Sequence, residues 1–135
     1  MSCPSIDREP SPGLTVLIAE DHEDSRDALR TLLEAFDYRV EIATNGREAV
    51  DVALATHPDL VLMDVMMPEV DGLEATRTLR ARADFRGVPI VALTAMEGAR
   101  EQVLAAGCDD YIAKPIDVRV FLAKVEHWAR SSRSV

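Results

Sequence analysis

Apolar residues along this chain follow two alternating patterns. Short runs of strand length occur at residues 14–19, 38–43, 59–63, 88–93 and 110–113. Between the runs, apolar residues recur at helical spacing, and the first such stretch places on one helix face Ala28, Leu29, Leu32, Leu33 and Phe36. The two patterns together predict five strands that alternate with five helices.

Several predicted helices carry residues typical of helix starts. Asn45 with Glu48 three residues later resembles an N-cap with a reciprocal acidic partner, and Asp71 and Asp117 stand where N-caps belong. Each of these residues precedes a stretch with helical apolar spacing. They therefore predict where the second, third and fifth helices begin.

Glycines and apolar spacing predict where other helices end. Gly87 and Gly107 are placed as helix stops. The last helix is predicted over about residues 118–131, and its expected buried face consists of Val120, Phe121, Val125 and Trp128.

Strands that alternate with helices require crossover connections, which join parallel strands. The runs at 59–63 and 88–93 are the continuous apolar type expected of strands covered on both faces. We therefore predict an α/β fold, a single (βα)5 doubly wound parallel sheet, over residues 14–131. Residues 1–13 are expected to form a flexible leader and residues 132–135 a C-terminal tail.

Composition and charge exclude several classes of function. The 135 residues carry a formal net charge of −9, which argues against direct nucleic-acid binding because phosphates attract basic surfaces. No apolar run approaches the roughly 20 residues of a membrane helix and no signal-peptide pattern begins the chain, so we expect a cytoplasmic protein without membrane insertion. Cys3 and Cys108 are expected to be reduced, and His22, His57 and His127, which share no metal-ligand spacing, to be surface or helix-end residues.

Polar residues follow four of the five predicted strands. Glu20 and Asp21 follow the first strand, Asp64 the third, Thr94 the fourth and Lys114 the fifth. The carboxyl ends of parallel strands meet at one edge of the sheet, where ligands of open α/β folds bind. We therefore expect these five side chains to converge.

Each of these residues also has an ordinary structural interpretation. A polar residue at a strand end often serves only as a turn former or a helix cap. Asp21 or Asp24 would then cap the first helix, and Lys114 would be a surface lysine before a proline. The agreement of four strand ends favours a functional site.

The residue types in this set suit a divalent cation and a phosphoryl group. Two carboxylates ~4 Å apart repel by about 4 kcal/mol at an effective dielectric constant of about 20, and a bound cation removes that cost. Ligand sets made only of oxygen favour Mg²⁺ or Mn²⁺. Lys114 and Thr94 offer a positive charge and a hydroxyl donor to phosphoryl oxygens. Asp64, at the end of a central strand, is the candidate nucleophile that would become an aspartyl phosphate.

The chain resembles the receiver domain of the two-component response-regulator family over residues 14–130. The stretches that carry this resemblance are "VLIAED" (16–21), "DLVLMDVMMPEVDG" (59–72), "VPIVALTA" (88–95) and "AAGCDDYIAKP" (105–115). The resemblance implies a flavodoxin-like fold with strand order 2-1-3-4-5. It also implies a signalling phosphoacceptor that promotes only its own phosphorylation and dephosphorylation, not an enzyme with a separate substrate.

The resemblance implies a role for each acidic residue. Asp64 would accept a phosphoryl group from a phosphohistidine of a histidine kinase or a histidine phosphotransfer protein. Asp21 and Asp64 would bind Mg²⁺ with the backbone carbonyl of Met66, and Glu20 would assist through water. The family most often has two aspartates at positions 20 and 21, so Glu20 is a departure.

Further roles implied by the resemblance concern the fourth and fifth strands. Thr94 and Lys114 would hold the phosphoryl oxygens, and Tyr111 would be the switch aromatic that turns inward as Thr94 moves. The bond before Pro115 would be cis. A downstream protein would read the face formed by residues from about 97 to 128, and the chain would be a monomer or a weak dimer.

Two further expectations concern the lifetime of the phosphate and the setting of the chain. Met66 and Met96 present apolar side chains near the site, so we expect a fairly long-lived phosphate, which a half-life of seconds at neutral pH would contradict. The chain is expected to be a stand-alone regulator, with a receiver cut from a hybrid kinase as the other possibility.

Three other functions fit this set of residues less well. A phosphatase of the haloacid dehalogenase type requires a second acid where Met66 stands. A flavodoxin requires a phosphate-binding loop after the first strand, where "EDHEDSR" (20–26) would repel phosphate. A receiver-like interaction module that works without phosphate is the remaining alternative, and only Glu20 favours it.

Overall fold

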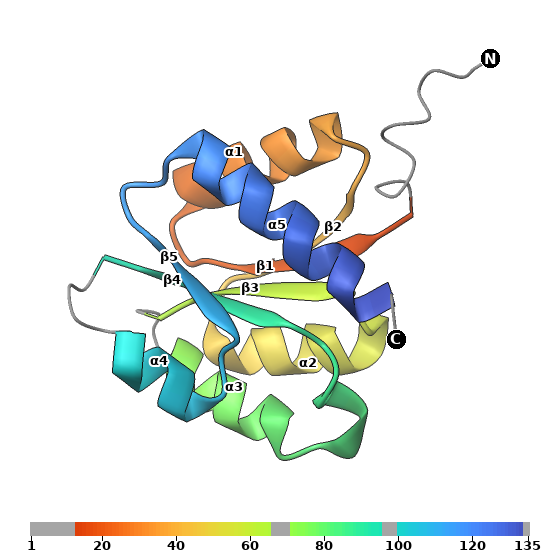
Figure 1. Cartoon of the computed structure of the whole chain (residues 1–135), viewed down its shortest axis with the longest axis vertical. Helices are drawn as coiled ribbons and strands as arrows, with labels where there is room; N and C mark the ends of the chain where they lie inside the picture. The colour runs from red at the N-terminus through yellow and green to blue at the C-terminus, as the bar shows by residue number, and fades with distance from the viewer. Residues whose placement is uncertain (1–12, 66–70, 96–99, 134–135) are drawn as a thin grey trace.

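A five-stranded parallel sheet forms the centre of the computed structural model, which describes residues 13–65, 71–95 and 100–133 (Figure 1). Its strands are β1 Thr15–Ala19, β2 Arg39–Ala43, β3 Leu60–Asp64, β4 Ile90–Thr94 and β5 Asp110–Ala113. They pair in the order β2-β1-β3-β4-β5, and every neighbouring pair is parallel. The predicted fold class and the implied strand order are confirmed.

Helices cover both faces of this sheet. In the described residues they are α1 Glu23–Ala35, α2 Gly46–Thr56, α3 Gly72–Arg80, the short 3₁₀ helix η2 Ala83–Phe85, α4 Arg100–Ala106 and α5 Val118–Arg133. Helices α1 and α5 lie on one face, and α2, α3 and α4 lie on the other (Figure 1). Helix α5 continues to Arg133, two residues beyond the predicted end of the fold.

The alternation of side chains along the strands separates two apolar cores. Leu17 and Val61 point into the core beneath α2, α3 and α4, whereas Ile18 and Leu62 point into the core beneath α1 and α5. All five residues of β3 and of β4 are buried. The central strands are therefore fixed from both sides, and the residues at their carboxyl ends have rigid positions.

The predicted N-caps of α2, α3 and α5 are confirmed by their hydrogen bonds. The Asn45 side chain accepts from the Glu48 amide at 2.8 Å. Asp71 accepts from the Glu74 amide at 2.8 Å, and Asp117 accepts from the Arg119 amide at 2.9 Å. These contacts satisfy backbone donors that have no partner within the first helical turn.

The start of α1 differs from the predicted one. Its N-cap is His22, whose side chain makes no capping hydrogen bond, so neither Asp21 nor Asp24 has that role. Asp24 lies within the first turn, where a negative charge interacts favourably with the helix dipole and stabilises the helix. The Asp21 carboxylate is thus not used as a helix cap.

Three predictions about helix faces and ends are wrong. Phe36 lies just after α1 and is 44% exposed, because α1 ends at Ala35 and the chain turns toward β2. Val120 is also 44% exposed. The buried face of α5 consists of Phe121, Val125 and Ala129, and Val120 lies about 100° around the helix from its neighbour Phe121. Gly87 does not end α3, which stops at Arg80 before η2.

Candidate functional site

The carboxyl edge of the sheet brings the predicted site residues to neighbouring strand ends. Glu20 and Asp21 directly follow β1, Asp64 is the last residue of β3, Thr94 is the last residue of β4, and Lys114 follows β5. Since β1, β3, β4 and β5 are consecutive in the sheet, all five residues lie along one edge. Glu20, Asp64 and Thr94 are almost completely buried.

Asp64 is held in place by its own backbone and by its neighbours. The residue after it, Val65, donates its amide to the Leu93 carbonyl at 3.0 Å and accepts from the Gly72 amide at 3.2 Å. Gly72 begins α3, and a Cβ added there would lie 2.0 Å from the Asp64 carbonyl oxygen. Only glycine allows α3 to start this close to the end of β3.

Lys114 joins two of the predicted acidic residues. Its Nζ donates to Glu20 Oε1 at 3.0 Å and to Asp64 Oδ2 at 3.2 Å. Burial lowers the pKa of Lys114, but the hydrogen bond to Glu20 and the negative charges of Asp64 and Glu20 outweigh it, so the pKa lies above its ordinary value. The Lys114–Pro115 peptide bond is cis, the isomer implied by the resemblance.

Glu20 has no solvent-exposed surface and is nevertheless held in its charged form. Burial raises the pKa of Glu20, whereas hydrogen bonds from the Lys114 ammonium and the His22 amide help to lower it below its ordinary value. Arg26 also donates from Nη1 to the Glu20 carbonyl oxygen at 3.1 Å. The carboxylate therefore remains available as a negatively charged ligand inside the protein.

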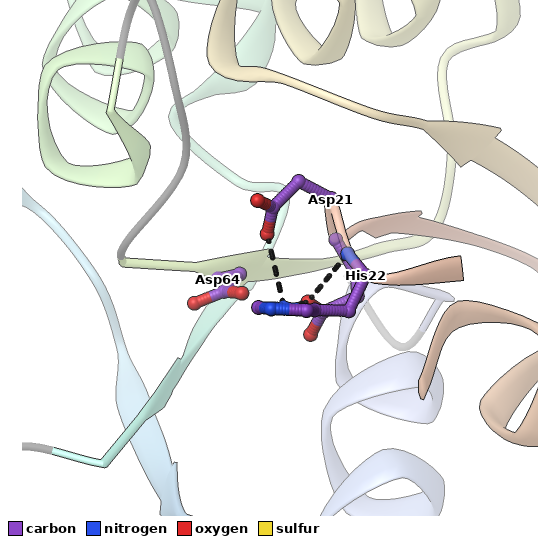
Figure 2. A group of neighbouring side chains, drawn as sticks. Asp21, His22 and Asp64 are labelled. Carbon is purple, nitrogen blue, oxygen red and sulfur yellow. Dashed lines mark hydrogen bonds and ion pairs between the residues drawn. The ribbon is translucent and has the colours of Figure 1, made fainter. Parts of the chain in front are cut away.

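The acidic cluster has one more member than the sequence indicated. One ligand atom from each of Glu20, Asp21, His22 and Asp64 lies within 4.8 Å of the others. The prediction that His22 is a surface or helix-end residue is confirmed, since it is the N-cap of α1 and its side chain is 74% exposed. Its Nδ1 nevertheless lies 3.3 Å from Glu20 Oε2 and 3.4 Å from Asp21 Oδ1. Figure 2 shows its ring extending from the end of β1 toward Asp64. In the sequence, the only feature that points to a role for His22 in this cluster is its position directly after Glu20 and Asp21.

Asp21 and its neighbours suit a hard cation. Asp21 Oδ1 is buried and accepts no hydrogen bond from any described residue. Three carboxylates, those of Glu20, Asp21 and Asp64, face one ammonium, that of Lys114, which leaves excess negative charge at this edge. A buried acceptor without a donor and a surplus of carboxylate oxygen are the conditions under which Mg²⁺ binds favourably. The predicted fourth ligand, the Met66 carbonyl, lies outside the described residues, as does Met96.

Tyr111 and Thr94 lie on adjacent strands. Tyr111 pairs in register with Ala92, two residues before Thr94, and packs partly buried against the core beneath α4. Lys124 of α5 donates to the Tyr111 carbonyl oxygen at 2.7 Å, and its Nζ lies 5.3 Å from the centre of the Tyr111 ring. The aromatic residue is thereby linked to the surface of α5.

A cavity of about 290 Å³ opens beside Lys114. Its lining is mainly apolar and comes from the end of β1, the first half of α1 and the segment after β5: Glu20, Ser25, Ala28, Leu29, Lys114, Pro115 and Ile116. The candidate site therefore adjoins a hollow in which a partner side chain has room.

In the described part of the chain, no helix is long and apolar enough to cross a membrane.

The chain is similar to a family of known proteins over most of its length. The model of the response regulator receiver domain matches residues 16–126. A curated relative, the polar-differentiation response regulator DivK of Brucella ovis, is 40% identical over 116 residues, which are 84% of this chain and 94% of the relative.

Solved structures are similar to the chain in both sequence and fold. The receiver domain of the sensor histidine kinase PA1611 from Pseudomonas aeruginosa, with a magnesium ion coordinated in its active-site cleft, is 37% identical with a TM-score of 0.80, and the match covers 87% of this chain and 98% of that one. The receiver domain of the response regulator Ssk1 from Saccharomyces cerevisiae, in complex with the histidine phosphotransfer protein Ypd1, is 30% identical with a TM-score of 0.81 over 88% of this chain and 90% of that one.

Proposed function

Because the chain belongs to the response regulator receiver domain family, we propose that Asp64 accepts a phosphoryl group from a phosphohistidine of a partner protein. The observation that supports this proposal most directly is the position of Lys114, whose Nζ lies 3.2 Å from Asp64 Oδ2 and 3.0 Å from Glu20 Oε1. A fixed ammonium beside a buried carboxylate provides charge stabilisation where phosphoryl oxygens would lie.

The transfer forms a bond between an Asp64 carboxylate oxygen and phosphorus and breaks the bond between phosphorus and the histidine nitrogen. Asp64 needs no proton removed, because it reacts as the carboxylate. The buried Thr94 hydroxyl and the Lys114 ammonium bind the phosphoryl oxygens. Phosphoryl transfer depends mainly on such positioning and charge stabilisation.

We propose Mg²⁺ as the cofactor, with Mn²⁺ as an alternative. Asp21 and Asp64 would hold it, and Glu20 would assist through water. When bound, the ion supplies positive charge that offsets the carboxylates and the incoming phosphate. The absence of a hydrogen bond to Asp21 Oδ1 from any described residue and the excess of carboxylates in the cluster support this assignment.

The proposed donor is a histidine kinase or a histidine phosphotransfer protein. The Ssk1 receiver domain, to which this chain is similar, is solved in complex with such a phosphotransfer protein. The apolar cavity between α1 and the segment after β5 lies beside Lys114 and suits a partner side chain. A histidine presented there would reach the edge of the sheet that holds Asp64.

The proposed output is a change at the face formed by α4, β5 and α5. Phosphorylation adds negative charge beside Thr94 and Lys114 and biases the protein between two pre-existing arrangements. Tyr111 is the proposed switch residue, and its contacts with Lys124 connect it to α5. A downstream protein would bind this face of a monomer or weak dimer, and the chain would modify no substrate besides itself.

The first experiment is intact mass spectrometry after incubation with Mg²⁺ and acetyl phosphate, a small phosphodonor that needs no partner. The wild type should gain one phosphoryl group, and the gain should disappear with EDTA and in Asp64→Ala. A matched control, Asp51→Ala, removes an exposed aspartate of α2 and should still gain the group. No gain in a folded wild type would overturn the proposal and favour an interaction module that works without phosphate.

A further inference from the structure

His22 lies close enough to the acidic cluster to serve as a ligand. Nδ1 is 3.3 Å from Glu20 Oε2 and 3.4 Å from Asp21 Oδ1, and one of its ring nitrogens belongs to the four-residue group within 4.8 Å. Ligand atoms at 2.0–2.1 Å from an octahedral ion are separated by about 3 Å when adjacent and about 4 Å when opposite. Small side-chain adjustments would therefore bring the donors of Asp21, His22 and Asp64 onto one ion, with Glu20 assisting through water.

The backbone fixes His22 while leaving its ring adjustable. The His22 amide donates to Glu20 Oε2 at 3.2 Å, and its carbonyl oxygen accepts from the Arg26 amide at 2.9 Å at the start of α1. The side chain is 74% exposed and makes no capping hydrogen bond. Reorienting the imidazole toward an ion would break no core packing and no helix cap.

A nitrogen donor changes which cations a carboxylate site prefers. Mg²⁺ favours oxygen ligands and keeps several waters, whereas imidazole suits the first-row transition metals, whose affinities rise from Mn²⁺ to Co²⁺ and Ni²⁺. The carboxylates alone would therefore form a site that prefers hard cations such as Mg²⁺. An imidazole beside them makes the site one of mixed hardness.

We propose that His22 donates a ring nitrogen to the divalent cation at Glu20, Asp21 and Asp64, and that this nitrogen raises the affinity for Mn²⁺ and Co²⁺ relative to Mg²⁺. The inference rests on the metal site of the proposed function. It goes beyond that site by adding a ligand and a cation preference. The exchange of one bound water for the imidazole requires the neutral ring.

The test is electron spin echo spectroscopy of the Mn²⁺-loaded protein. Wild type should show modulation from a directly bound imidazole nitrogen, and labelling histidine with ¹⁵N should change it. His22→Asn retains an amide that can hydrogen-bond to the carboxylates but has no imidazole, so the modulation should vanish while Mn²⁺ still binds. His127→Asn, which removes an exposed histidine of α5, should leave the modulation unchanged.

Binding constants provide a second readout. His22→Asn should weaken Co²⁺ by about tenfold, a loss of the size seen when groups around a metal are altered, and leave Mg²⁺ within about twofold. Bound Mn²⁺ without nitrogen modulation, together with an unchanged ratio of Co²⁺ to Mg²⁺ affinity, would overturn the inference and leave the carboxylate site intact. Failure of Mn²⁺ and Mg²⁺ to bind at all, or binding that survives Asp21→Asn with Asp64→Asn, would overturn the proposed metal site as well.

Discussion

Charged side chains form hydrogen bonds at both edges of the sheet, but their partners and their burial differ: Arg80 at the amino edge is partly exposed, whereas Glu20 and Asp64 at the carboxyl edge are buried. At the amino edge, Arg80 donates from Nε to the Gly107 carbonyl at 2.7 Å, from Nη1 to the Val88 and Phe85 carbonyls, and from Nη2 to Asp109. Each nitrogen of this guanidinium has a fixed partner. At the carboxyl edge, three carboxylates face the one ammonium of Lys114, and Asp21 Oδ1 accepts no hydrogen bond from a described residue, its contact there being His22 Nδ1 at 3.4 Å.

The comparison distinguishes structural charge from functional charge. A buried charge whose hydrogen bonds are all made holds chain segments together, and its removal leaves its partners unsatisfied. A cluster with excess charge of one sign destabilises the fold until a ligand of the opposite sign binds. The same sheet thus carries a structural clamp at one edge and a candidate binding site at the other.

The largest expected effect on stability comes from breaking the clamp. Arg80→Ala should lower the free energy of unfolding by about 3 kcal/mol, because it removes the guanidinium donors to the Gly107 and Val88 carbonyls and the ion pair with Asp109, which keeps only the Ile90 amide as donor among the described residues. Urea unfolding followed by circular dichroism measures this change. Asp64 should still accept phosphate in the folded fraction.

The control for the clamp is a charged pair without burial. Arg130 donates to Glu126 at 2.8 Å, and both side chains are about half exposed, so Arg130→Ala should change stability by no more than about 0.5 kcal/mol. Equal losses in the Arg80 and Arg130 variants would remove the distinction between the clamp and a surface pair.

The second prediction links the packing of α3 to the candidate site. Gly72→Ala places a Cβ 2.0 Å from the Asp64 carbonyl oxygen, so α3 or the end of β3 must shift. We expect a loss of about 2 kcal/mol in the free energy of unfolding and slower phosphorylation by acetyl phosphate. Gly87→Ala is the matched control, since a Cβ there meets nothing within 4 Å. Unchanged phosphorylation in a destabilised Gly72→Ala would show that the position of Asp64 does not depend on this contact.

The third prediction has the opposite sign and tests the excess charge. Asp21→Asn removes one of three carboxylates without removing a hydrogen bond from a described residue to Oδ1. In EDTA the variant should be about 1 kcal/mol more stable than wild type, because carboxylate repulsion is relieved. Adding excess Mg²⁺ should stabilise wild type more than the variant and narrow the difference. Urea unfolding that shows destabilisation in EDTA would argue against the excess-charge interpretation.

The smallest expected effect on stability concerns Asp110, a charged residue whose two carboxylate oxygens both accept hydrogen bonds. One carboxylate oxygen accepts from Lys124 at 3.1 Å and the other from Trp128 Nε1 at 3.1 Å. Burial raises the pKa of Asp110, but the hydrogen bonds from Trp128, the Tyr111 amide and Lys124 outweigh it and lower the pKa below its ordinary value.

A lowered pKa in the folded state stabilises the fold above the ordinary carboxyl pKa, and this contribution disappears as the pH falls through the lowered pKa. Asp110→Asn should therefore be less stable than wild type near neutral pH, by less than about 1 kcal/mol since the pair is partly exposed. The difference should vanish in acid. Unfolding measured across acidic pH tests this, and a difference that grows toward acid would contradict it.

Local patterns in the sequence were enough to predict much of the fold. Apolar periodicity located five strands and five helices, and Asn45, Asp71 and Asp117 marked three helix starts. These features depend on neighbours within a few residues, so the sequence contains the relevant information directly. The convergence of polar residues at strand ends followed from the general geometry of parallel sheets.

Predictions that needed the orientation of a helix were less successful. Val120 and Phe121 are adjacent and both apolar, but only Phe121 is buried, because the rotation of α5 on the sheet decides which of them faces the core. Phe36 likewise fits the apolar spacing of α1 but lies beyond its end. Spacing predicts that a helix has an apolar face, while packing sets the limits of that face.

The sequence by itself determined the order of strands and helices along the chain and the residues at the strand ends. Tertiary structure decided how those residues pair: Lys114 bridges Glu20 and Asp64, 94 and 50 residues away, and Arg80 clamps Asp109, 29 residues away. It also placed the exposed His22 against the acidic cluster. Such contacts arise when helices pack on both faces of the twisted sheet, because distances between side chains far apart in sequence are set by that packing and not by local backbone preference.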